Sequence, residues 1–321
     1  NFMNWIKKIK QFGDNIKSNI KKKFPSREEI ESSKWKAKNC CNSGPILEEE
    51  LKENFYQCKN CNTTYPVKPS ERFSWMFWNN QYEILDHPII NDPDTLEWQD
   101  ASGKYIDKLN KTRKKTGLNS ALVAAYGNLT DKLKAVVIAS DYRYFGSSIS
   151  QDEGECILYA CEKSIQENAP LIIFAQGGGM RVNVASTLSL NQMPRSIIGI
   201  NEVKKKNIPV LVVCDHVVAG GISASYASVS DLMFFESIKT RLMFAGPRVA
   251  ANASNTTPPP NFCEASWALK HGIGDFLIEQ RKDTKDTLVK LLNILLKIDT
   301  SVSSVSTNET TESNLTAREV S

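Results

Sequence analysis

From residue 121 onward, short apolar runs alternate with longer segments of mixed polarity. The apolar runs are typical of strands that are buried within a sheet, and they cover residues 121–126, 135–140, 171–174 and 210–214. Segments with helical patterning lie near residues 152–166 and 197–206. This alternation predicts a layered α/β core with largely buried strands.

The beginning of the chain has a different pattern. Its apolar residues recur at roughly helical spacing, namely Phe2, Trp5, Ile6, Ile9, Phe12, Ile16 and Ile20. Lysines occupy the other faces, and between Lys7 and Lys38 eleven Lys or Arg residues accompany only four acids. We expect residues 1–34 to form a basic amphipathic arm that docks on the main domain or on a partner subunit. Contact with a membrane surface or a nucleic acid is the alternative.

Composition limits the class of protein. The chain has 321 residues, of which 41% are apolar and 24% charged, which is typical of a soluble globular protein. No stretch reaches the roughly 18 consecutive apolar residues of a membrane span. Residues 300–321 contain almost no large apolar side chains, so we expect a disordered tail. The patterns thus predict an arm (1–34), a small cysteine-containing module (35–66), a main domain (67–299) and the tail.

Four of the eight cysteines lie in the small module. Cys58 and Cys61 form a C-x2-C knuckle, whose spacing lets two thiolates bind one tetrahedral Zn²⁺ ion. Cys40 and Cys41 are adjacent, and adjacent cysteines do not fit an ordinary knuckle turn. The beginning of the chain lacks the apolar segment of a secretory signal, so a reducing compartment and metal binding are expected rather than disulfides. The module is therefore either a distorted zinc ribbon with four cysteine ligands or a ribbon that has lost its metal.

Two predicted strands run directly into glycines. Residues 171–174 lead to Gly178 and Gly179, and residues 210–214 lead to Gly220 and Gly221. A backbone without Cβ atoms lets a ligand approach its N–H groups closely, and such groups at a helix start can hold an anion or a developing oxyanion. A tight strand-to-helix turn is the alternative for each pair. Neither segment has the spacing of a phosphate-binding loop.

Several segments resemble, in the same order, the β subunit of the bacterial and plastid type of acetyl-CoA carboxylase carboxyltransferase. The similar stretches are Trp35 with the cysteine cluster, residues 105–117, Phe145-Gly146-Ser147-Ser148, Gly178-Gly179-Met180-Arg181, Gly220-Gly221-Ile222-Ser223-Ala224-Ser225, Asp231-Leu232, Phe244-Ala245-Gly246-Pro247-Arg248-Val249, residues 259–262 and residues 270–275. The resemblance covers roughly residues 35–295, and the Phe-Ala-Gly-Pro-Arg-Val string is its most specific part.

The resemblance implies a crotonase-like (ClpP/crotonase) fold, a ββα superhelix, with a small zinc-ribbon-like module in front. It implies transfer of a carboxyl group from carboxybiotin, held on a biotin carboxyl carrier protein, to acetyl-CoA. The product is malonyl-CoA for fatty acid synthesis, within an ATP-binding carboxylase complex. An alpha subunit is the implied partner, in an α2β2 assembly of the bacterial cytoplasm or the plastid stroma.

The resemblance also implies roles for particular residues. Gly220, Gly221, Gly178 and Gly179 are the expected oxyanion or thioester-binding positions. Arg181, Gly146 and Arg248 are expected near CoA, although either arginine could instead form a structural ion pair. Cys40, Cys41, Cys58 and Cys61 are the expected zinc ligands. The histidines His87, His216 and His271 stand in unlike contexts, and none is expected to act as a base.

The sequence departs from the family at two places near the expected CoA pocket. Residues 146–151 contain one glycine where the family has three, and Val182-Asn183-Val184 replaces Met-Gln-Glu. These changes are compatible with a divergent enzyme and with a non-catalytic scaffold or regulatory paralogue. Two further hypotheses are a nucleic-acid-binding ribbon and a crotonase-type enzyme that acts on acyl-CoA without a biotin carrier.

Overall fold

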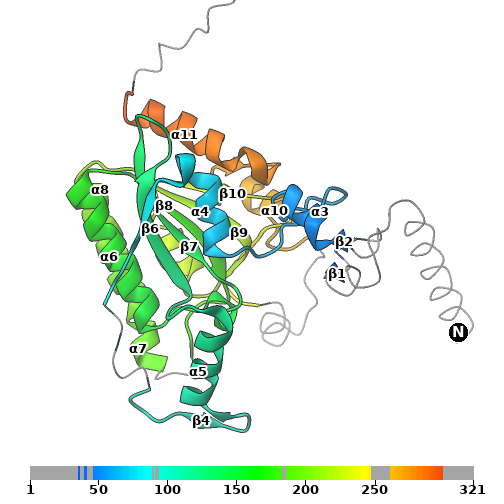
Figure 1. Cartoon of the computed structure of the whole chain (residues 1–321), viewed down its shortest axis with the longest axis vertical. Coiled ribbons are helices and arrows are strands. Elements are labelled where there is room, and N and C mark those ends of the chain that lie inside the picture. Colours follow the sequence, from blue (N-terminus) through cyan, green and yellow to red (C-terminus); the bar gives the residue numbers. More distant parts are fainter. Residues whose placement is uncertain are drawn as a thin grey trace, which may run out of the picture.

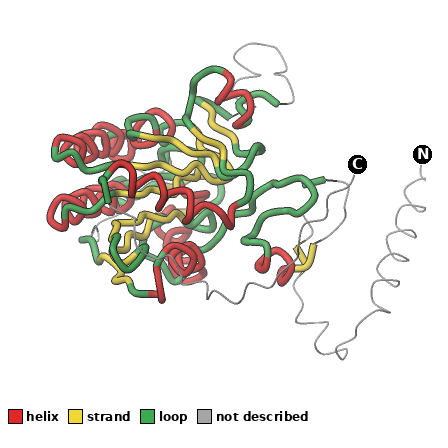
Figure 2. Tube along the Cα trace, turned by 90° about the horizontal axis from the view of Figure 1, so that it is seen from above, coloured by secondary structure: helices red, strands yellow, loops and turns green. Residues whose placement is uncertain are grey.

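The computed structural model describes residues 35–36, 40–41, 46–88, 90, 94–182, 186–246 and 261–298. The predicted arm, the predicted tail and Arg248 lie outside the described residues. The described part contains one main sheet with helices on both faces and a small module beside it (Figures 1 and 2). None of its helices is long and apolar enough to cross a membrane.

The main sheet has eight strands, in the spatial order β12-β10-β9-β8-β7-β6-β3, with β11 paired to the later part of β9. Strands β7 to β12 pair parallel with one another, whereas β6 pairs antiparallel with both β7 and the edge strand β3. The bounds are β3 (Tyr82–Leu85), β6 (Leu122–Asn128), β7 (Lys134–Ser140), β8 (Leu171–Gly177), β9 (Val210–Ala219), β10 (Leu232–Phe235), β11 (Arg241–Met243) and β12 (Phe276–Leu277).

The central strands are buried on both faces. Successive side chains point to opposite sides of the sheet, so each strand contributes to both buried clusters. In β8, Leu171 and Ile173 belong to one buried apolar cluster, and Ile172 and Phe174 belong to the cluster on the other face. This explains why the central strands appear in the sequence as continuous apolar runs and not as alternating ones.

Helices cover both faces of the sheet (Figure 1). One cluster is completed by α6 and α8, and the other by α4 and α11. Their bounds are α4 (Pro69–Met76), α6 (Gln151–Glu167), α8 (Gln192–Lys205) and α11 (Thr284–Leu295). The remaining elements are short, apart from α5: η1 (Trp78–Asn80), β4 (Gln99–Asp100), β5 (Gly103–Lys104), α5 (Tyr105–Thr116), η2 (Phe145–Ser147), α7 (Ser186–Leu190), η3 (Ser223–Ala227), α10 (Ala265–Lys270) and η4 (Arg281–Asp283).

The cysteine module, by which we mean the described residues between 35 and 66, lies to one side of the main sheet in both views (Figures 1 and 2). It contains the antiparallel pair β1 (Trp35–Lys36) and β2 (Ile46–Leu47), followed by α3 (Glu48–Glu53). Leu51, Tyr56 and Tyr65 pack around the cysteines in a small apolar cluster of their own.

The four predicted strands and both predicted helices are confirmed. The strands β8 and β9 are longer than predicted because they extend through polar residues to the glycine turns. Helix α8 begins at Gln192, five positions before the predicted start at residue 197. Pro194 lies in its first turn, where a missing N–H is tolerated.

Candidate active site and metal centre

The two glycine turns meet at the carboxyl ends of the central strands β8 and β9. We call the turn after β8 the first turn and the turn after β9 the second turn. Strands β8 and β9 are parallel neighbours, so the turns that follow Gly177 and Ala219 emerge side by side. A Cβ atom on Gly179 would lie 3.0 Å from the amide nitrogen of Gly221. A Cβ atom on Gly220, whose φ is +59°, would lie 3.2 Å from the carbonyl oxygen of Gly178. The turns therefore pack backbone against backbone, at a distance that side chains would not allow.

This arrangement leaves amide donors unused. Among the described residues, the N–H groups of Gly178, Gly179 and Gly221 donate no hydrogen bond. Gly178 is exposed, and a Cβ atom there would meet nothing within 4 Å, so this side of the turn is open. The N–H of Gly220 instead donates to the carbonyl of Met243 at 3.1 Å. Gly220 thus shapes the second turn, whereas Gly178, Gly179 and Gly221 offer the free donors.

The segment around Gly146 packs against the first turn. A Cβ atom on Gly177, whose φ is +133°, would lie 2.5 Å from the carbonyl oxygen of Ser147 and 2.9 Å from that of Gly146. The structure therefore brings Gly146 to the glycine turns. Gly177 was missed in the sequence analysis, although its position directly before the predicted pair was a usable signal.

Arg181 anchors the first turn from inside the protein. Its side chain is 6% exposed, and Nη2 donates to Glu153 Oε1 at 2.9 Å and to the carbonyl of Ser148 at 2.6 Å. Nη1 donates to the hydroxyl of Tyr105 at 3.2 Å. Burial lowers the pKa of Arg181, but the Glu153 carboxylate more than offsets this, so the pKa lies above its ordinary value. All three guanidinium nitrogens donate to protein groups, so the contacts of Arg181 are those of a structural ion pair.

Glu153 was missed in the sequence analysis. It is 0% exposed and accepts hydrogen bonds from the backbone N–H of Ala121 at 2.8 Å and of Ser150 at 2.7 Å. The sequence Ser150-x-x-Glu153 is a capping-box pattern at the start of α6, and the structure contains that box. Glu153 therefore joins β6, α6 and Arg181 behind the glycine turns.

The histidines lie in three different settings. His216 is in β9 with a φ of 59°, and its ring meets that of Tyr142 edge-on at 5.8 Å between centroids. The ring of His271 stacks on Trp267 at 4.3 Å, and His87 is close to the carbonyl of Pro88. His216 lies in a strand because β9 continues to Ala219.

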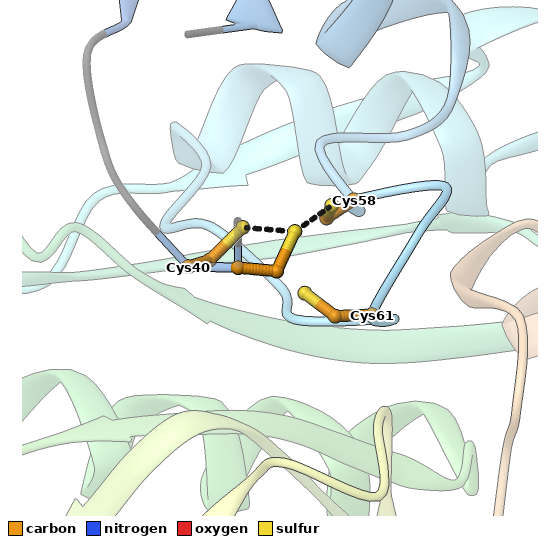
Figure 3. Close-up of side chains that lie close together, drawn as sticks. Cys40, Cys58 and Cys61 are labelled. Atoms are coloured by element: carbon orange, nitrogen blue, oxygen red, sulfur yellow. Dashed lines mark hydrogen bonds between the residues drawn. The ribbon is translucent and has the colours of Figure 1, made fainter. Parts of the chain in front are cut away.

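The four cysteines of the module come together (Figure 3). Their sulfur atoms all lie within 4.8 Å of one another, and the Cys40–Cys41 and Cys41–Cys58 Sγ distances are both 3.9 Å. Four sulfurs placed 2.3 Å from a tetrahedral zinc ion would be about 3.8 Å apart. The adjacent pair thus contributes both of its thiols, which we expected from the sequence only for a distorted site. The four residues fit a metal ion.

Two arginines and two acids form a buried cluster between the cysteine module and the sheet. Arg72 donates to Glu236 at 2.5 and 2.8 Å and to Asp215 at 3.0 Å. Arg281 donates to Glu236 at 2.9 Å and also pairs with Asp215. All four side chains are at most 2% exposed. No sequence signal pointed to this cluster, since its members lie far apart along the chain.

The cluster depends on its charges. Burial raises the pKa of Glu236, but Arg72 and Arg281 outweigh this effect and hold the pKa below its ordinary value. A lowered pKa stabilises the folded state at neutral pH, and this stabilisation is lost as the pH falls through the folded-state pKa. The stabilisation that comes from Glu236 is therefore present only while its carboxylate is ionised.

Comparison with known proteins gives consistent results. Residues 91–319 match the family model of the carboxyl transferase domain. The chain is 41% identical, over 97% of each protein, to the acetyl-coenzyme A carboxylase carboxyl transferase subunit beta of Pelagibacter ubique. It is 33% identical to the subunit of the same name from Liberibacter asiaticus, over 92% of this chain and 99% of that protein.

Solved structures support the same fold. Transcarboxylase 12S superposes with a TM-score of 0.57 at 16% identity, over 77% of this chain and 43% of that chain. A Pseudomonas malonate decarboxylase hetero-tetramer gives 0.53 at 17% identity, over 74% and 92%. The predicted crotonase-like α/β fold is confirmed. The chain therefore belongs to the acetyl-coenzyme A carboxylase carboxyl transferase subunit beta family and is a carboxyltransferase.

Proposed function

We propose that the chain, paired with an alpha subunit, transfers a carboxyl group from carboxybiotin to acetyl-CoA and so forms malonyl-CoA for fatty acid synthesis. The observation that carries this proposal is the pair of glycine turns, in which the amides of Gly178, Gly179 and Gly221 donate no hydrogen bond among the described residues and Gly178 is exposed. The relatives that bear the carboxylase name support the choice of substrate.

The amides act on the thioester of acetyl-CoA. Loss of a proton from the acetyl methyl group places negative charge on the thioester oxygen, and fixed N–H donors stabilise that oxygen more strongly as its charge grows. Gly178 and Gly221 supply such donors from two different turns, while Arg181 and Glu153 hold the first turn in place. Carboxybiotin, brought by the carrier protein, supplies the carboxyl group.

The four clustered cysteines are proposed to bind one Zn²⁺ ion as a structural site. All four positions are filled by protein sulfurs, so the metal would have no open position for a substrate. In the C-x2-C knuckle, the N–H of Asn62 donates to the carbonyl of Cys58 at 2.9 Å, and the N–H of Cys58 donates to the carbonyl of Thr63 at 2.9 Å.

We expect one zinc ion per chain in the purified complex, and we expect Cys58→Ser to remove most of it because one of four thiolates is lost. Elemental analysis measures the metal. The control is Cys161→Ser, since Cys161 is buried elsewhere in the main domain and should leave the metal content unchanged. Equal zinc content in Cys58→Ser and the unaltered chain would rule out the site.

The proposed activity is tested by reconstitution with an alpha subunit and a carboxylated biotin carrier, followed by measurement of malonyl-CoA. We expect product only when all three proteins and acetyl-CoA are present. Product without the carrier would favour an acyl-CoA enzyme of another kind. An assembled complex that makes no product would favour a non-catalytic scaffold.

The bacterial relatives favour the bacterial cytoplasm as the compartment, and we propose an α2β2 assembly.

A further inference from the structure

The cysteine module is connected to both strands that frame the Gly220 turn. That turn follows β9, and β11 runs beside the end of β9, with Met243 paired to Ala219. The carbonyl of Met243 accepts the N–H of Gly220 at 3.1 Å and the hydroxyl of Ser223 at 3.0 Å. The position of the turn is therefore set by two strands, β9 and β11.

The first connection runs from the module to β9 through Arg281. Nη1 of Arg281 donates to the carbonyls of Phe55 at 3.0 Å and Tyr65 at 2.9 Å, both in the module. Nη2 of the same guanidinium pairs with Asp215 of β9. The backbone N–H of Arg281 also donates to the side chain of Gln57 at 2.9 Å. A single buried side chain thus joins module carbonyls to the strand that leads into the turn.

The second connection runs from the C-x2-C knuckle to β11 through Ser237. The hydroxyl of Ser237, which is 0% exposed, donates to the carbonyl of Asn62 at 2.5 Å. Asn62 directly follows Cys61, has a φ of 58°, and donates its own N–H to the carbonyl of Cys58. On the other side, the carbonyl of Ser237 accepts the N–H of Thr240, the residue before β11.

We propose that Ser237 and Arg281 are positioning residues through which the metal-bound cysteine knuckle holds the Gly220 turn in its active geometry. A metal ion fixes the knuckle, and the knuckle fixes the direction of the Asn62 carbonyl that Ser237 contacts. The inference rests on the proposed role of the glycine turns in catalysis. It assigns the cysteine module a role in the reaction beyond that of a separately folded appendage.

The test measures hydrogen exchange in the reconstituted complex, before and after a chelator removes the metal. We expect faster exchange in residues 215–224 and 240–246, which contain the turn and β11. Residues 122–140, which contain β6 and β7, should be unchanged. Metal loss that loosens residues 55–65 but leaves 215–224 unchanged would overturn the proposal. Equal loosening of every segment would overturn it as well, because that is general unfolding.

A second arm leaves the metal in place. Ser237→Ala removes the hydroxyl that contacts Asn62, and we expect the same two segments to exchange faster, with kcat lowered about tenfold and KM for acetyl-CoA nearly unchanged. Ser237→Thr keeps the hydroxyl and should restore kcat. Ser230→Ala is the matched control, because Ser230 also donates to a carbonyl, that of Ala227 at 3.0 Å, but outside this path.

The outcomes separate this proposal from the proposed function. If kcat of Ser237→Ala equals that of Ser230→Ala, the positioning role is wrong even if the complex makes malonyl-CoA. If the exchange pattern appears but blocking the glycine turns leaves carboxyl transfer intact, the connection exists and the catalytic assignment of the turns is wrong.

Discussion

Arg281→Met is expected to lower the free energy of unfolding by about 3–5 kcal/mol, the typical cost of breaking a buried ion pair from one side. The substitution leaves Asp215 and Glu236, both at most 2% exposed, with Arg72 as their remaining arginine partner. It also removes the donor to the carbonyls of Phe55 and Tyr65. Methionine keeps much of the packing volume, so the loss reports on charge and hydrogen bonding.

Urea unfolding of the complex, followed by far-UV circular dichroism, measures this effect. Arg195→Met is the control, because the Arg195–Glu155 ion pair of 2.7 Å has side chains that are 39% and 25% exposed. Such a surface pair contributes about 0–1 kcal/mol. If Arg281→Met were no more destabilising than Arg195→Met, the buried cluster would not have the importance that we assign to it.

Gly178→Val is expected to lower kcat/KM for malonyl-CoA formation by about 100-fold or more while leaving the melting temperature nearly unchanged. A Cβ atom at Gly178 meets nothing within 4 Å, and the φ of this residue is not in the left-handed region, so the fold accommodates the side chain. The isopropyl group would occupy the open side of the turn and keep the thioester from its amide donors. Loss of one such donor costs about 10²–10³ in rate.

Gly127→Ala is the matched control for this prediction. A Cβ atom there would lie 2.3 Å from the carbonyl oxygen of Gln81, in the β3–β6 pair at the far edge of the sheet. This variant should melt at a lower temperature, yet its folded fraction should retain normal kcat. A Gly178→Val complex with full activity would show that substrate does not approach this turn.

The central strands and α6 could be predicted because their signals are local. Buried parallel strands appear as uninterrupted apolar runs, and the capping box at Ser150 marks a helix start. The shared role of the two glycine pairs was implied by the family resemblance, and the structure brings them together because they follow neighbouring strands of the same sheet. That Gly220 uses its own amide inside the fold could not be foreseen, since its partner Met243 belongs to a short strand without a strong pattern.

The features that the sequence analysis missed depend on distant partners. Arg72 and Glu236 are 164 positions apart, and neither residue type suggests burial by itself. The sequence left the role of the adjacent cysteines open, because their ability to face one metal centre depends on backbone geometry that spacing does not specify. Arg181 matched a family segment, yet its contacts with Tyr105 of α5 and Glu153 of α6 arise only in the folded chain, because these residues lie far from it in the sequence.

The most direct test of the paired glycine turns uses amide NMR of the complex in which only this subunit carries ¹⁵N-glycine. The chain has 16 glycines, so single variants suffice to assign the signals. An acetyl-CoA analogue with a ketone in place of the thioester is then added. We predict shifts for Gly178, Gly179 and Gly221, with little change at Gly103 and Gly272. Bound analogue that leaves those three signals in place would contradict the catalytic role of the turns.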